Sequence, residues 1–126
     1  MKRLIVVALV MVILAGFTAF HIVRINKFST EALKISGRIQ EELLKDNWDE
    51  IGGLINRLGD VWYKNRLWAG VTLRTDIIDE IEISLAQCKK YAEIRAKENF
   101  TGELQMFSML VEHLPKQEGA ALGELL

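Results

Sequence analysis

Residues 4–23 read LIVVALVMVILAGFTAFHIV and contain no Asp, Glu, Lys or Arg. As a helix that rises 1.5 Å per residue, this run is about 30 Å long, which matches the hydrocarbon thickness of a bilayer. Met1, Lys2 and Arg3 place a cationic start before it. We therefore expect a transmembrane helix at the N-terminus and the lipid bilayer as its first partner.

A cleaved secretory signal is the alternative interpretation of this segment. Signal cleavage requires small residues at the first and third positions before the cut. A cut after Ala19 places Phe17 at the third position, and a cut after Ala15 places Ile13 there. The run also exceeds the apolar core of about 7–15 residues that signals carry. We favour an uncleaved signal anchor.

The charges that flank the run give conflicting indications of which side of the membrane the rest of the chain lies on. Counting Lys and Arg favours a cytoplasmic C-terminal domain, because more of them follow the run than precede it. Those that follow are Arg24, Lys27, Lys34 and Arg38. A cationic head followed by an apolar run instead favours export. We expect a single pass through the cell membrane with an extracytoplasmic C-terminal domain, and the cytoplasmic orientation is the alternative.

After this run, apolar residues recur at steps of three and four, which puts one apolar stripe on each of four helices. The stripes are Phe28, Ala32, Ile35, Ile39 and Leu43; Trp48, Ile51, Ile55, Leu58 and Trp62; Ile78, Ile81, Leu85, Cys88 and Ala92; and Leu104, Phe107, Leu110 or Val111, and Leu114. Nothing separates the first stripe from the apolar run. The predicted fold class is all-α, with one N-terminal transmembrane helix that continues into an antiparallel helical bundle.

Three turns are expected between these helices. Asp46-Asn47 offers a break and an N-cap for the second helix. Residues 66–72 interrupt the pattern, either as a turn around Gly70 or as a helix that passes through, and Thr75 then caps the third helix. The third turn is expected at residues 99–102, where Thr101 would cap the last helix.

The single proline, Pro115, is expected to end the last helix, because proline has no N–H to donate. The predicted domains are a membrane anchor (1–27), a helical bundle (28–114) and a C-terminal tail (115–126). No internal repeat of about 34 residues supports a tetratricopeptide array.

Two glycines and one tryptophan are the candidate contact residues. Gly52 and Gly59 lie one heptad apart beside the second stripe, where they either weaken the helix or open a groove that another helix approaches closely. We favour close helix packing at both. Trp68 lies off the stripe and could touch lipid headgroups, a partner or another helix, so it is the candidate interaction surface.

The composition speaks against catalysis and against nucleic acid. A formal net charge of -1 gives no surplus of cations for phosphates. His21 and His113 are the only histidines, and Cys88 falls on an apolar stripe as a buried, inert thiol. We predict no catalytic residues, no metal and no cofactor, and therefore no enzyme.

A short pattern within these helices resembles a known family. Trp68 is followed by the run Asp79-Glu80-Ile81-Glu82-Ile83-Ser84-Leu85 and by Tyr91. With the cationic start and one span, this resembles W-x(n)-D-x-I-E-x-S-L-x(n)-Y of a family of small membrane-anchored bacterial proteins, domain of unknown function 4363. The resemblance implies that the protein is bacterial and has spore-forming relatives. It implies no particular biochemical activity. Family members often carry a histidine before the I-E segment, but Arg74-Thr75 stand there, so no histidine role carries over.

Two functions follow from the anchored bundle. The first is a protein-protein interaction module or accessory subunit of a membrane complex, with a membrane protein or a second copy as its partner. The alternative is an extracytoplasmic sensor whose ligand sits between helices. An apolar cavity near Gly52 and Gly59 would favour the sensor, whereas a filled core with an exposed apolar patch would favour the interaction module.

Overall fold

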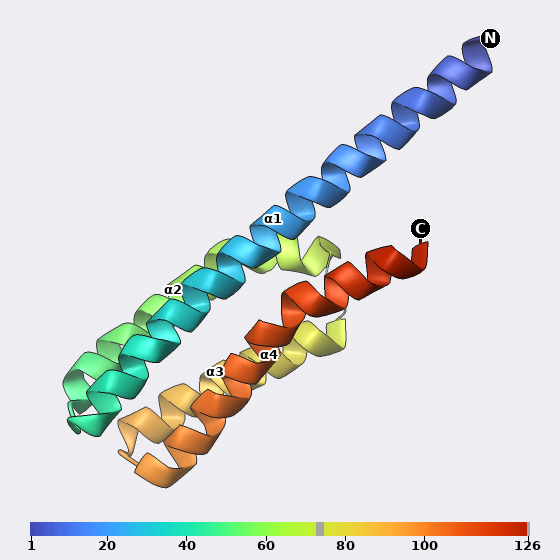
Figure 1. Ribbon diagram of the computed structural model, residues 1–126. Coiled ribbons are helices and arrows are strands. Elements are labelled where there is room, and N and C mark those ends of the chain that lie inside the picture. The colour runs from blue at the N-terminus through green and yellow to red at the C-terminus, as the bar shows by residue number, and fades with distance from the viewer. Residues whose placement is uncertain (73–74, 126) are drawn as a thin grey trace.

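The computed structural model describes the backbone of residues 1–72 and 75–125, and the side chains of residues 1–67, 69 and 75–114. Within these residues the chain forms helices alone, namely α1 (Lys2–Leu44), α2 (Trp48–Thr72), α3 (Thr75–Glu93) and α4 (Lys97–Leu125). The helices run alternately up and down (Figure 1). In the ring that they form, α1 and α3 each contact both α2 and α4. The predicted all-α bundle is confirmed.

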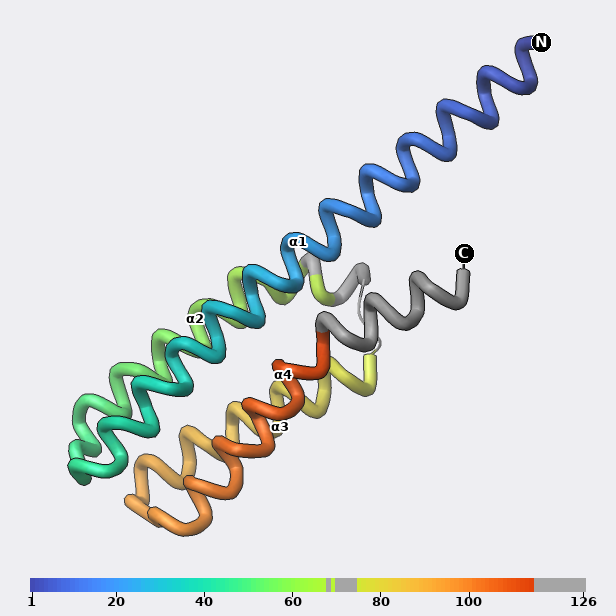
Figure 2. Tube along the Cα trace, viewed as in Figure 1, coloured from blue at the N-terminus to red at the C-terminus, as the bar shows by residue number. Residues whose placement is uncertain are grey.

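Helix α1 is one uninterrupted helix of 43 residues. Its first half projects beyond the other helices, and its second half lies within the bundle (Figure 2). Burial on α1 begins at His21 and Ile25, so the end of the predicted anchor range already belongs to the core. The predicted continuation of the apolar run into the bundle is confirmed.

The four stripes meet in one filled core. Every stripe residue is buried except Trp48, Ala92 and Leu110, which are half-buried at its edge. The rings of Phe28 and Trp62 lie 5.6 Å apart between α1 and α2, and those of Trp48 and Phe100 lie 5.7 Å apart between α2 and α4. The core also takes in apolar residues outside the predicted stripes: Ile25, Leu54, Val61, Ala69 and Phe100.

Helix α1 ends at the predicted break. The Asn47 N–H donates to the Glu42 carbonyl, and the Asp46 N–H donates to the Leu43 carbonyl, each at 3.1 Å. Asp46 has a φ of 54°, in the left-handed region. These two bonds and the left-handed residue form a Schellman cap, which satisfies carbonyls at the helix end.

The turn between α3 and α4 is not where the sequence predicted it. The same cap recurs at Arg95, whose φ is 55°, and the Ala96 N–H donates to the Tyr91 carbonyl at 2.9 Å. Residues 99–102 lie inside α4, and the Thr101 hydroxyl donates to the Lys97 carbonyl at 2.7 Å instead of capping a helix. The prediction was wrong because a non-glycine residue takes the left-handed position, so no glycine marks the turn.

Near the predicted second turn, the helix passes through Gly70. Helix α2 continues to Thr72, so the interruption expected over residues 66–72 is helical. Thr75 is the first residue of α3.

The prediction that Pro115 ends the last helix was wrong, because α4 runs on to Leu125. In a helix, residue 115 would donate its N–H to the carbonyl of Val111, and proline cannot. The Ser29 hydroxyl of α1 donates to that carbonyl instead, at 3.1 Å. The carbonyl freed by proline is therefore satisfied from the neighbouring helix.

A hydrogen bond between two serine hydroxyls also joins α1 and α4. Ser36 and Ser108 lie with their Oγ atoms 2.7 Å apart, and Ser108 donates its own proton to the Leu104 carbonyl. Ser36 is therefore the donor in the pair. With Ala32 between them, Ser29 and Ser36 form a row of small buried residues along which α4 packs.

Candidate functional site

The projecting half of α1 is an apolar surface that the bundle leaves exposed. Between Leu4 and Phe20, every large apolar side chain is exposed. Among the described helices, α1 is the one long and apolar enough to cross a membrane. This helix is compatible with a membrane anchor or with a signal sequence.

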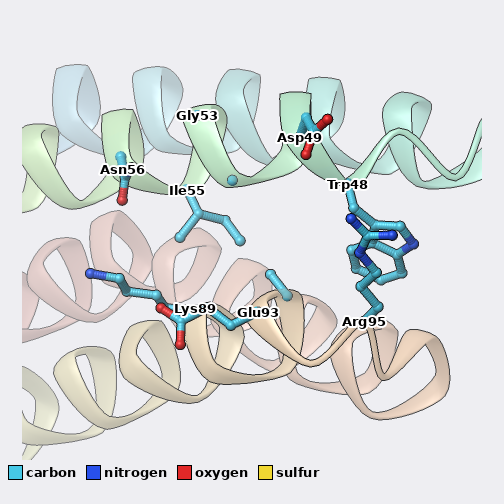
Figure 3. A pocket seen from close by; sticks show the side chains of 10 residues that line it. Trp48, Asp49, Gly53, Ile55, Asn56, Lys89, Glu93 and Arg95 are labelled. Carbon is cyan, nitrogen blue, oxygen red and sulfur yellow. The ribbon is translucent and has the colours of Figure 1, made fainter.

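A groove runs between α2 and α3, beside the candidate glycines. It opens as two adjoining hollows of about 430 Å³ and 310 Å³, which share Ile55, Asn56 and Lys89. Trp48 and Arg95 line one end of the larger hollow, and Asn56 and Lys89 line the other (Figure 3).

Gly52 and Gly59 line this groove. A Cβ built on either residue meets nothing within 4 Å among the described atoms, apart from its own helix. Within the described part of the chain, the space beside both glycines is therefore open. Packing of the two glycines against a helix of another molecule stays a prediction.

Glu82 holds α2 and α3 together on the side of the groove. Its carboxylate accepts a hydrogen bond from the Trp62 indole N–H at 3.2 Å and pairs with the Arg66 guanidinium. The Trp62 side chain is fully buried, so its N–H needs this acceptor.

Four residues of the family pattern have structural roles in this fold. Ile81 and Leu85 lie in the core, and Glu82 joins two helices as described above. Ser84 is buried and donates to the Glu103 carbonyl of α4 at 3.4 Å. These four residues therefore hold α3 against α2 and α4.

An apolar patch lies over the outer face of α3 and α4. Ile83 and Met106 are more than half exposed, and with half-buried Leu110 they line a shallow hollow of about 300 Å³. Glu80 and Glu103 flank this hollow. The α3–α4 patch is thus apolar at its centre and acidic at its rim.

Cys88 lies where the sequence placed it, buried on the inner face of α3. Burial, and in second place the negative charge of Glu103, raises the pKa of the thiol to about 12. A thiol with such a pKa is protonated at neutral pH and is a poor nucleophile. Within the described residues, His, Cys, Asp and Glu side chains form no group of three that could hold a metal ion.

Trp68, the candidate interaction surface, lies on α2. The side chain of Trp68 lies outside the described residues.

The sequence patterns did not predict that Ser29, Ser36 and Ser108 join α1 to α4. The steps of three and four from Ser29 through Ala32 to Ser36 do follow the first stripe. Serine is more often exposed than buried, so a serine within an apolar stripe does not by itself indicate burial.

Comparison with known proteins gives one family. A family model, described as Domain of unknown function (DUF4363), matches residues 19–125. No curated protein and no solved structure matches the chain. The match begins two residues before His21, the first buried side chain of the bundle, and it covers α2, α3, α4 and the part of α1 from residue 19 onward. The chain therefore belongs to the DUF4363 family.

Proposed function

We propose that this chain is a single-pass membrane protein whose helical bundle serves as a protein-protein interaction module or accessory subunit of a membrane complex, without a catalytic step of its own. The proposal rests on the difference in exposure between the two halves of α1. Its large apolar side chains are exposed up to Phe20, and its buried side chains begin with His21 and Ile25. An exposed apolar helix of this length costs free energy in water and is stabilised in a bilayer.

The anchor is tested by washing membranes that contain the full chain. We expect the chain to stay in the pellet after carbonate or high-salt treatment, because the apolar run is too long to be released. A mature chain that begins close to residue 20 would instead identify a cleaved signal.

The α3–α4 patch supports an interaction role. Monomeric proteins seldom expose clustered large apolar residues without a use, and methionine adapts to varied partner surfaces. The acidic rim of Glu80 and Glu103 favours a partner that carries Lys or Arg beside an apolar stripe. Such a partner is a helix of another membrane protein or a second copy of this chain.

Affinity purification from native membranes in mild detergent tests this role. Met106→Glu should abolish retention of the partner, because it places a charge in the centre of the patch. Ile94→Glu is the matched control, since Ile94 is also exposed (62%, against 53% for Met106) but lies outside the patch, at the end of α3. Equal retention by both variants would exclude the patch as the docking surface.

We also propose that the bundle lies outside the cytoplasm. The cationic start followed by the apolar run supports this orientation, while Arg24 and Lys27 oppose it. A cysteine introduced by Leu44→Cys in a Cys88→Ala background should react with an impermeant maleimide on intact cells, because Leu44 is 83% exposed. Reaction only in opened cells would place the bundle inside.

The groove between α2 and α3 favours a second candidate, a sensor or ligand-binding bundle. Asp49, Glu93, Lys89 and Arg95 all line the larger hollow, and this mixture of charges suits a ligand that carries both signs. Mass spectrometry of the natively purified chain should then find a small molecule that Gly52→Phe displaces. The core itself is filled and the groove is open, so the interaction module is the better supported function.

A further inference from the structure

The α3–α4 patch lies level with a definite part of α1. Met106, which lines the hollow of the patch, lies two residues, or about 3 Å, before Ser108 on α4. The hydroxyl oxygen of Ser108 is 2.7 Å from that of Ser36 on α1. The patch is therefore level with the part of α1 around Ser36.

Helix α1 carries two exposed cations at this level. Lys34 and Arg38 lie two residues before and two residues after Ser36, and both are exposed. They are one helical turn, or about 6 Å, apart on one face, which we call the cationic face of α1. Gly37 lies between them, and a Cβ built there meets nothing within 4 Å apart from its own helix. An apolar side chain from another molecule can therefore approach between the two charges.

The acidic rim of the α3–α4 patch has the same spacing. Glu103 is level with Ser84, since the Ser84 hydroxyl donates to the Glu103 carbonyl at 3.4 Å. Glu80 lies one turn before Ser84 on α3, so Glu80 and Glu103 are also separated by about 6 Å along the bundle. Helices α1 and α3 run in the same direction (Figure 1). Glu80 therefore precedes Glu103 along the bundle in the same sense as Lys34 precedes Arg38.

The cationic face and the patch lie on different sides of the bundle. Arg38 pairs with Glu50 at 4.0 Å, so the cationic face turns toward α2. The patch lies over α3 and α4, and Figure 1 shows these two helices on the other side from α1 and α2. The pair of Arg38 with Glu50 is half exposed and contributes little, so it leaves Arg38 able to meet another carboxylate. A contact between this face and the patch therefore joins two molecules.

On the proposed function, which this inference rests on, neighbouring copies stand at one height. Each copy is anchored by the same residues 4–23, so side by side in one bilayer they present equal levels to each other. Two patches that met would bring Glu80 near Glu80 and Glu103 near Glu103, and like charges across an interface repel. The cationic face instead brings opposite charges together at both levels.

We propose that the α3–α4 patch binds the cationic face of α1 of a second copy. Lys34 of one copy lies opposite Glu80 of the next, and Arg38 lies opposite Glu103. Such a contact uses a different face on each of the two copies, so every copy retains one face of each kind for a further neighbour. Copies can then add in a row, or close into a ring, in the plane of the membrane.

Cross-linking in isolated membranes tests this contact. Two full-length chains with different affinity tags, both with Cys88→Ala, are coexpressed, one with Gly37→Cys and the other with Ile83→Cys. A short bismaleimide is added, and products that carry both tags are measured. Leu44→Cys in place of Gly37→Cys is the matched control for random collisions. Leu44 is 83% exposed but lies seven residues, or about 10 Å, farther along α1.

We expect the mixed product of Gly37→Cys and Ile83→Cys to exceed the Leu44→Cys control several-fold. Lys34→Glu in the Gly37→Cys chain should lower the product to the collision level, and Glu80→Lys in the other chain should then restore it. Lys45→Glu makes the same change of charge beyond the end of α1 and should leave the product unchanged.

Two results would overturn the contact. A product between two Ile83→Cys chains would show that the patch packs on itself. Products at the collision level throughout would show that no second copy covers the patch. Retention of a partner by the wild type but not by Met106→Glu, measured by affinity purification, reports on the interaction role separately, so that role can stand when the contact between copies fails.

Discussion

The Ser29 hydroxyl donates to the carbonyl of Val111 at 3.1 Å, across the contact between α1 and α4. That carbonyl is the one that Pro115 leaves without its usual helical donor. Ser29 is 5% exposed and Val111 is fully buried, so no water replaces the missing N–H easily. A proline in α4 is thus tolerated because a helix from the other end of the chain supplies a donor.

Ser29→Ala should destabilise the full chain by about 1–3 kcal/mol, because it leaves a buried carbonyl without a donor. The loss should be smaller in a Pro115→Ala background, where position 115 regains an N–H for the same carbonyl. Urea unfolding of the four proteins in detergent micelles, followed by far-UV circular dichroism, measures the coupling. Equal losses in both backgrounds would contradict the substitution of one donor for the other.

Glu82→Ala should cost about 1–3 kcal/mol, since the buried Trp62 indole N–H loses its acceptor. Glu82→Gln should cost less, because the amide oxygen still accepts from Trp62 and only the charge facing Arg66 is lost. The pair with Arg66 is partly exposed, so its own contribution is small. The same unfolding measurement separates the two variants, and a larger loss for Glu82→Gln would contradict this order.

Gly59→Ala should stabilise the chain by up to about 1 kcal/mol, because a Cβ there meets no other helix and alanine favours helix. Gly37→Ala, on α1, is the control, since a Cβ there also meets nothing within 4 Å. Thermal unfolding should show the same sign for both. A destabilised Gly59→Ala beside a stabilised Gly37→Ala would indicate that another molecule packs into the groove.

Cys88 should make stability fall as the pH rises above about 9. The folded state holds the thiol proton up to a pKa of about 12, whereas the unfolded thiol releases it near 9.0, so alkaline pH favours unfolding. The stability advantage of the wild type over Cys88→Ala should therefore shrink between these two pH values. A pH-independent difference, or rapid reaction of folded Cys88 with a thiol reagent at neutral pH, would contradict its burial.

The sequence by itself determined the helices, the stripes and the first turn. Steps of three and four dictate which face of a helix is apolar, and burying such faces is the main driving force for packing. That is why Phe28 through Leu43 on α1, and Ile78 through Cys88 on α3, lie in the core as the pattern indicates. The apolar run likewise needed no neighbour to be recognised, because its length and lack of charge are local properties.

Tertiary structure decided the features that depend on a neighbouring helix. Phe100 packs against Trp48 in the core, so the last turn lies before it, at Arg95. No local sequence signal predicts that an arginine takes the left-handed conformation. Pro115 lies inside α4 because Ser29 satisfies the Val111 carbonyl from 82 positions away. Gly52 and Gly59 line a groove, since the spacing of α2 from α3 depends on side chains from both helices. Local sequence specifies which face a helix buries, but donors, gaps and turns between helices depend on residues that only the folded chain brings together.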